Sequence, residues 1–279
     1  TDATNIQQNK AYYDQFYTPH KLTATVQRAR NWQAYLEDAK QTHTSWRGLY
    51  ANQFETRLKG KKVLELGSGD GLNALIMAML GATVFAIDIS EASQEMLAEA
   101  ADLLDLTNIT AASGDFSEFE FDPQSFDFVV GKGFLHHLTH ETERAYLAKA
   151  ATLLKREGEA RFFEPAVNSQ ALDQLRWMIP IADRPSSLNR KAFAEWQARD
   201  PHPLRDNSSG HYQQLGVDYF SHVAIEYLGS IERLYRLVPR GSSKYAFRRW
   251  AHRADLKLPR WVRHMAARSQ LIVYTNPMV

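Results

Sequence analysis

The feature that most constrains the fold of this chain is a glycine-rich turn directly after a short apolar run. Residues 63–66 have the pattern of a buried strand, and the turn at 67–71 leads into an apolar segment, 72–80, that predicts a helix. Glycine lets the backbone approach a ligand closely, and the free N–H groups of a helix start favour a polar ligand. The unit therefore predicts a parallel α/β sheet with a ligand site at the carboxyl end of its first strand.

Strands and helices alternate along the middle of the chain. Apolar runs predict strands at 83–88, 109–113, 126–130 and 158–164, and helical patterns lie between them at 91–106 and 141–154. Ser90 is a suitable N-cap for the first of these helices. The alternation predicts an α/β fold, a doubly wound (Rossmann-like), mostly parallel sheet with helices on both faces. Segments 220–228 and 271–274 complete it to seven strands.

The same patterns divide the chain into four parts. Residues 1–60 are rich in aromatic side chains and predict a helical N-terminal cap, and 61–166 form the predicted cofactor-binding core. The alternation breaks after Pro165, and 167–218 contains four prolines and a polar run. An insertion of this length in a compact domain is usually functional, so we expect a substrate lid. Residues 219–279 then complete the sheet and include a basic, helical connection.

The composition excludes several classes of protein. The 279 residues are 44% apolar, and 33 basic side chains nearly balance 32 acidic ones, which argues against a protein that coats nucleic acid. The absence of cysteine excludes disulfides, a thiol nucleophile and cysteine-ligated metals. No apolar run approaches the roughly 20 residues that span a bilayer, and the polar start has no signal-peptide core. We therefore expect a cytoplasmic protein with no transmembrane segment.

One stretch departs from this balance of charge. Between residues 233 and 268, 11 Lys and Arg side chains accompany a single acid, Asp255, and Trp and Phe are interleaved with the cations. This stretch carries about +10, while the whole chain carries +1. The pattern favours an anionic acceptor, a peripheral membrane contact or a subunit interface in a homo-oligomer. The alternative is a solvated pair of helices that the acidic remainder neutralises.

Two carboxylates near the glycine turn indicate what it binds. Asp88 ends the second strand 21 residues after Gly67, at the spacing where a carboxylate receives ribose hydroxyls, which indicates an adenosine-containing cofactor. The dinucleotide fingerprint G-x-G-x-x-G is not met, because position 72 is leucine, and no Gly-Lys-Ser/Thr follows as in a P-loop. Glu65, just before the turn, suits a cationic ligand better than a pyrophosphate.

The run Glu65-Leu66-Gly67-Ser68-Gly69-Asp70-Gly71 resembles the first motif, E/D-x-G-x-G-x-G, of the class I S-adenosylmethionine-dependent methyltransferases of small-molecule type. Segments 114–116, 126–138 and 153–159 are similar to further segments of that family, so the resemblance covers about residues 60–165. It implies S-adenosyl-L-methionine as the cofactor. The residues implied to bind it are Glu65, Gly67, Ser68, Gly69, Gly71, Asp88, Ile89, Asp115, Phe116, Lys132 and, from the N-terminal helix, Tyr13.

Several of these implied roles have structural alternatives. The resemblance places Asp115 on the adenine amino group and Phe116 on the adenine ring, but Asp115 is also suited to cap a helix. Lys132 either approaches the carboxylate of the cofactor or forms a salt bridge elsewhere. Tyr13 either closes over the cofactor or lies on an ordinary amphipathic core helix.

Methyl transfer from a sulfonium is an in-line displacement in which alignment of the reactants supplies much of the catalysis, so no triad is required. The candidate catalytic residues are His136, His137, His211 and Glu164. The alternative for the adjacent histidines is packing beneath the cofactor, and for Glu164 it is a buried carboxylate bonded to the backbone. We expect no metal, because adjacent histidines diverge on a helix.

The sequence thus predicts methyl transfer from S-adenosylmethionine to an O or N atom, or else a C atom, of a small-molecule acceptor. The long lid favours a bulky metabolite such as a natural product, a sugar or a lipid-linked intermediate, and nucleic acid is not expected. The alternatives are an NAD-dependent oxidoreductase and a non-catalytic scaffold protein that retains the cofactor fold.

Overall fold

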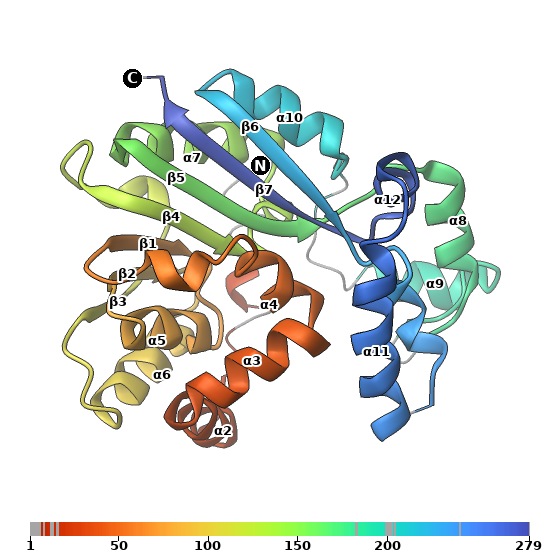
Figure 1. The fold of residues 1–279 in the computed structure, drawn as a ribbon, viewed down its shortest axis with the longest axis horizontal. Coiled ribbons are helices and arrows are strands. Elements are labelled where there is room, and N and C mark those ends of the chain that lie inside the picture. The colour runs from red at the N-terminus through yellow and green to blue at the C-terminus, as the bar shows by residue number, and fades with distance from the viewer. Residues whose placement is uncertain are drawn as a thin grey trace.

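The computed structural model describes residues 7, 9–11, 14, 17–181, 184–198, 203, 205–239 and 241–278 (Figure 1). Its centre is a seven-stranded sheet with the strand order β3-β2-β1-β4-β5-β7-β6. The strands are β1 (Lys62–Leu66), β2 (Thr83–Asp88), β3 (Ile109–Ser113), β4 (Phe126–Lys132), β5 (Leu154–Pro165), β6 (Phe220–Leu228) and β7 (Ser269–Pro277). Of these strands, β7 runs antiparallel to β5 and β6, and the other pairs are parallel. The predicted mostly parallel sheet is confirmed.

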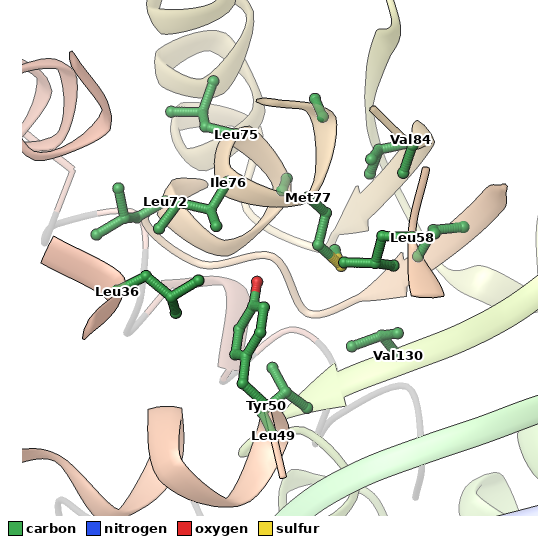
Figure 2. Close-up of a cluster of buried hydrophobic side chains, with 14 of the residues drawn as sticks. Leu36, Leu49, Tyr50, Leu58, Leu72, Leu75, Ile76, Met77, Val84 and Val130 are labelled. Atoms are coloured by element: carbon green, nitrogen blue, oxygen red, sulfur yellow. The ribbon is translucent and has the colours of Figure 1, made fainter. Parts of the chain in front are cut away.

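Helices cover both faces of the sheet (Figure 1). One apolar cluster packs α2 (Pro19–Arg30), α3 (Trp32–Thr42), α4 (Thr44–Leu49), α5 (Leu72–Met79) and α6 (Glu91–Asp102) against one face. A second cluster packs α7 (His140–Leu153) and α10 (Ser209–Val217) against the other. Figure 2 shows Tyr50 of the first cluster with its hydroxyl directed at α5, where it donates to Asn73 Oδ1 at 2.9 Å. The N-terminal helices therefore hold α5, the helix that begins at the glycine turn.

The helix starts follow the capping residues in the sequence. Ser90 caps α6 by accepting a hydrogen bond from the Ser93 N–H at 3.2 Å, as predicted, and Thr139 caps α7 in the same way. The α6 helix ends at Asp102, earlier than the predicted 106, because Asp105 has a φ of +55°, which breaks the helical conformation. In the other direction, β5 begins at Leu154 and extends the predicted strand by four residues at its start.

The segment expected to form a lid has two different halves. In the first, α8 (Gln170–Met178) and α9 (Arg190–Gln197) join through the rings of Trp177, Phe193 and Trp196, whose centroids lie 5.5–5.7 Å apart. In the second, α10 places Tyr212 and Leu215 in the core beneath the sheet. The segment expected to form a lid, 167–218, therefore ends in a helix of the core, and the lid stays a prediction for the part before α10.

The basic connection is helical, as expected. It contains the 3₁₀ helix η4 (Glu232–Leu237), α11 (Ser242–Asp255) and α12 (Arg260–Ala266). Ion pairs fix α11 to the rest of the protein, from Arg248 Nε to Glu232 Oε1 at 2.7 Å and from Arg249 Nη1 to Asp38 Oδ1 at 3.0 Å. Among the helices that the structure describes, none is long and apolar enough to cross a membrane.

Candidate active site

A cleft of about 270 Å³ opens at the carboxyl ends of β1, β2 and β4, where the sequence placed the ligand site. Eight of the residues implied to take part in cofactor binding or catalysis line it: Gly67, Gly69, Asp88, Ile89, Asp115, Phe116, Lys132 and His137. Its remaining walls come from Asn9, Tyr17, Leu66, Ile87, Gly114, Gly133, Phe134, Leu138 and Tyr146. Most of these come from the turns that follow strands, so the parallel sheet itself brings them together.

Asp88 fixes the glycine turn. Its Oδ2 accepts a hydrogen bond from the Gly69 N–H and its Oδ1 one from the Ser90 N–H, both at 2.9 Å. Burial raises the pKa of the Asp88 carboxyl, and the backbone bonds oppose that rise. Each oxygen retains further acceptor capacity toward the cleft, as a group that receives two ribose hydroxyls requires.

Gly69 and Gly71 serve the turn in different ways. Gly69 has a φ of +56°, and a Cβ at this position would meet, among the described residues, only the Tyr17 hydroxyl at 3.7 Å. Gly71 has a φ of +70°, and a Cβ there would lie 2.7 Å from Leu97, so its role is to let α6 pack on the turn. Ser68 is buried, and its Oγ accepts a hydrogen bond from Gln94 Nε2 at 2.7 Å. Ser68 and Gly71 therefore shape the turn without lining the cleft.

Glu65 is buried beside the turn with one oxygen unpartnered. Its Oε1 accepts a hydrogen bond from Asn73 Nδ2 at 2.7 Å, whereas Oε2 is buried without a hydrogen-bond partner among the residues that the structure describes. Burial raises the pKa of Glu65 to about 8, against the lowering influence of Lys132 and Asn73. Near neutral pH this pKa keeps the carboxyl protonated with one buried oxygen unsatisfied, which is costly, and a cationic ligand group beside it would favour the ionised form. Glu65 lies next to Leu66 and Gly67, which line the cleft, but does not line it itself, so its contact with an ammonium group of the cofactor stays a prediction.

Asp115 and Phe116 form the far wall of the cleft. Asp115 Oδ1 accepts hydrogen bonds from the Ser117 N–H at 2.7 Å and from the Tyr146 hydroxyl at 2.6 Å. Burial opposes ionisation, but the bonds from Ser117 and Tyr146 lower the pKa of Asp115. The capping alternative is thus present, since Asp115 caps η2 (Phe116–Glu118), and it coexists with a place in the cleft. Phe116 is buried and meets Tyr146 edge to face, with ring centroids 5.1 Å apart.

Lys132 ends β4 inside the cleft. Its Nζ lies 4.3 Å from the centroid of the Trp46 ring, and its charge lowers the pKa of Glu65. Lys132 is therefore a cation in the cleft wall that stacks on Trp46 of α4, and its approach to the carboxylate of the cofactor stays a prediction.

The adjacent histidines divide into one in the cleft and one behind it. His137 lines the cleft, whereas His136 Nδ1 lies 2.7 Å from Glu164 Oε2. Glu164 is fully buried, and its Oε1 accepts the backbone N–H groups of Phe134 and Leu135 at 2.9 and 2.8 Å. Glu164 is therefore the backbone-bonded carboxylate of the second alternative. It fixes η3 (Leu135–His137) and the His136 ring, and it does not line the cleft.

His211 lies outside the cleft in a network of ion pairs. Its Nε2 is 2.7 Å from Glu143 Oε2, and the guanidinium of Arg205 is 2.6 Å from Glu143 Oε1. Burial opposes ionisation of Glu143, but His211 and Arg205 lower its pKa. His140, Glu143 and His211 place their possible ligand atoms within 4.8 Å of one another. The guanidinium of Arg205 already neutralises the Glu143 carboxylate. We therefore interpret the network as a structural contact between the segment 205–211 and α7, and not as a metal site.

Some of the site lies beyond what the sequence motifs indicated. Tyr13 lies outside the described residues, but its neighbours Asn9 and Tyr17 line the cleft, and Asp14 Oδ1 accepts a hydrogen bond from Ser90 Oγ. The aromatic richness of residues 1–60 was the available signal for this N-terminal wall. Tyr146 gave no signal, because it sits on the apolar face of an ordinary amphipathic helix.

The sheet and the cleft together define a Rossmann-like, nucleotide-binding enzyme fold whose ligand lies outside the carboxyl ends of parallel strands. Residues 63–158 match the family model of a methyltransferase domain. An uncharacterised methyltransferase of Anoxybacillus flavithermus is 30% identical over 117 residues, which make up 42% of this chain and 53% of that protein. The chain spans about half the length of the curated relatives it matches.

Solved structures show the same fold. Phosphoethanolamine N-methyltransferase 2 of Haemonchus contortus, solved with S-adenosyl-L-methionine, has a TM-score of 0.52 at 15% identity, over 79% of this chain and 49% of that one. Geranyl diphosphate C-methyltransferase of Streptomyces coelicolor, solved with S-adenosyl-L-homocysteine, has a TM-score of 0.51 at 12% identity, over 80% and 77%. Residues 63–158 of this chain thus form a methyltransferase domain, in agreement with the S-adenosylmethionine-dependent family that the sequence motifs resemble.

Proposed function

We propose that the protein transfers the methyl group of S-adenosylmethionine to an O or N atom, or else a C atom, of a small-molecule acceptor. The observation that carries the proposal is the cleft in which Gly69, Asp88 and Asp115 converge beside the unpartnered oxygen of Glu65. The cofactor, when bound, supplies an electrophilic methyl group. Asp88 would accept the ribose hydroxyls, Asp115 and Phe116 would hold the adenine, and Glu65 and Lys132 would complement the charged groups at the other end.

Among the candidate catalytic residues, His137 is best placed to face an acceptor, because it lines the cleft. A base is needed only where the acceptor atom must lose a proton, and a neutral imidazole takes that role near pH 7. Glu164 fixes the backbone of η3 and the His136 ring, so we assign positioning roles to Glu164 and His136. His211 joins α10 to Glu143 of α7 and does not line the cleft, so we assign it no contact with the reactants.

The acceptor that we propose is a metabolite such as a natural product, a sugar or a lipid-linked intermediate. The support is the segment of α8 and α9, whose Trp177, Phe193 and Trp196 provide an aromatic unit after the carboxyl end of β5. The two solved proteins named above are methyltransferases of phosphoethanolamine and of geranyl diphosphate, which are both small molecules of different kinds. They agree with the class of acceptor and do not select a member of it.

Calorimetry with S-adenosylhomocysteine and with NAD tests the cofactor, and labelled methyl transfer to an acceptor panel tests the reaction. We expect binding of S-adenosylhomocysteine and transfer to at least one metabolite. In the Asp88→Ala variant, loss of charged hydrogen bonds worth about 1.5–3 kcal/mol should weaken cofactor binding at least tenfold. Preferential binding of NAD would favour the oxidoreductase. Cofactor binding without transfer to any member of the panel would favour the scaffold protein.

A further inference from the structure

Three short helices each expose apolar side chains on a single face. In α8, Leu175 and Met178 stand three residues apart on one helix face and are 56% and 44% exposed, and Ile179, directly after the helix, is 45% exposed. In the 3₁₀ helix η4, Leu234 and Leu237 are three residues apart, a spacing at which side chains eclipse. In α12, Trp261 and Met265 are four residues apart, and Trp261 is 68% exposed. Such clustering of large apolar side chains marks an interaction surface.

Hydrogen bonds join these helices to one another. Asn168, just before α8, donates through Nδ2 to the His264 carbonyl of α12 at 2.9 Å. Arg233 of η4 donates to the Ala266 carbonyl at the end of α12 at 3.2 Å. In Figure 1, α8 and α12 accordingly lie next to each other, beyond the end of the sheet. We call the exposed apolar side chains of α8, η4 and α12 the apolar end.

Cations surround the apolar end. The Tyr235 ring of η4 has Arg248, Lys244, Arg268 and Arg236 at 4.5, 4.8, 5.3 and 6.0 Å from its centroid. Exposed cations also directly precede exposed apolar residues in the chain, with Arg236 before Leu237 and Arg260 before Trp261. The nearby carboxylates are engaged, because Glu232 pairs with Arg248 and Arg268. The apolar end is thus framed by excess positive charge.

We propose that the apolar end docks the protein onto the surface of an anionic lipid bilayer. Apolar side chains with a tryptophan, bordered by Lys and Arg, match the boundary between acyl chains and anionic headgroups, and the cations match the negative potential of such a surface. The charge selects this occupant over a second copy of the chain, since two copies meeting through these faces would bring their cationic rims together. The proposal does not depend on which acceptor is methylated.

Co-sedimentation of the full chain with vesicles tests the proposal. We compare vesicles of mixed phosphatidylglycerol and phosphatidylcholine with vesicles of phosphatidylcholine alone. We expect at least tenfold stronger partitioning onto the anionic vesicles and a decline as salt rises, because exposed charges are screened over about 8–10 Å at physiological ionic strength. Equal partitioning onto both vesicles, or none onto either, would overturn the proposal.

Matched variants locate the surface. Leu237→Glu and Trp261→Glu should each reduce partitioning about tenfold. Leu103→Glu, at a 49% exposed leucine just after α6, changes the charge equally and should leave partitioning unchanged. Each variant should retain the thermal midpoint and the S-adenosylhomocysteine affinity of the parent. A failure of the membrane proposal is thereby distinguished from a failure of the proposed methyl transfer. If Trp261→Glu instead dissociates an oligomer in sedimentation velocity and leaves partitioning intact, the surface belongs to a second copy.

Discussion

At the scale of the residue, Glu65 shows how a binding group opposes stability. Its pKa is about 8 in the folded protein against 4.5 for the ordinary group, because it is buried. Between those pH values the folded state holds a proton that the unfolded state has lost, so the free energy of unfolding falls as pH rises toward 8. The loss is on the order of a few kcal/mol, since one pKa unit corresponds to about 1.36 kcal/mol.

Glu65→Gln should therefore stabilise the ligand-free protein at pH 8 and weaken its affinity for S-adenosylhomocysteine at least tenfold. Glutamine keeps the acceptor toward Asn73 but cannot ionise. Urea unfolding at pH 5 and pH 8 checks the first effect, and titration calorimetry checks the second. If the variant is no more stable than the parent at pH 8, the raised pKa of Glu65 is contradicted. If it binds S-adenosylhomocysteine normally, the role of Glu65 in cofactor binding is contradicted.

Gly69 permits a second test, because a matched glycine lies away from the cleft. Gly69→Ala and Gly60→Ala both introduce a side chain at positive φ, +56° and +72°, which should cost each about 1–2 kcal/mol of stability. At Gly60 no described residue lies within 4 Å of the added methyl group, whereas at Gly69 the methyl group lies 3.7 Å from the Tyr17 hydroxyl in the cleft. We expect weakened S-adenosylhomocysteine binding in the Gly69 variant alone, by calorimetry. Equal binding in the two variants would move the cofactor away from this turn.

At the scale of the element, Arg205 connects the segment before α10 to the cleft. Its Nη1 donates to the carbonyls of Leu135 and Leu138 at 2.7 Å, and its Nη2 pairs with Glu143, which is fully buried. Arg205→Met would leave a buried carboxylate without its guanidinium, which costs about 3–5 kcal/mol. Because Leu138 lines the cleft, cofactor affinity should fall as well.

Thermal and urea unfolding measure this effect against two references. Arg144→Met, on the same helix as Glu143, breaks a pair with Asp218 in which both side chains are exposed, and should change stability far less, because solvent screens such a pair. Adding Glu143→Gln to Arg205→Met should recover part of the loss, because the isolated charge is then gone. An equal loss of unfolding free energy in the Arg205 and Arg144 variants would show that the buried pair contributes no more to stability than the exposed one.

The buried His252 of α11 should make the stability of the protein sensitive to acid. Burial lowers the pKa of His252 to about 4 from 6.5, so below pH 6.5 the unfolded state takes up a proton that the folded state refuses. Stability should fall by up to about 3 kcal/mol as pH drops from 6.5 to 4. His252→Gln should flatten this part of the profile in urea unfolding followed across that range. Identical slopes for parent and variant would assign the acid sensitivity to other groups.

At the scale of the whole molecule, local signals in the sequence predicted the sheet and the glycine turn, because each depends on residues close in the chain. Asp88 and Asp115 were found for the same reason, since each directly ends or follows a strand. The network of Glu143, Arg205 and His211 was missed, because its partners are 62–68 residues apart and no periodicity records them. The core position of α10 was missed too, because the prolines and polar residues before it resemble a continuous loop.

The place of β7 has a consequence for synthesis of the chain on the ribosome. Residues 269–277 fill the slot between β5 and β6, so β6 has no partner among the described strands until this segment leaves the exit tunnel. Until then β5, with its mostly buried side chains, offers an open strand edge to other nascent chains. A chain halted before residue 269 should therefore be prone to aggregation and depend on chaperones, even with its glycine turn already made.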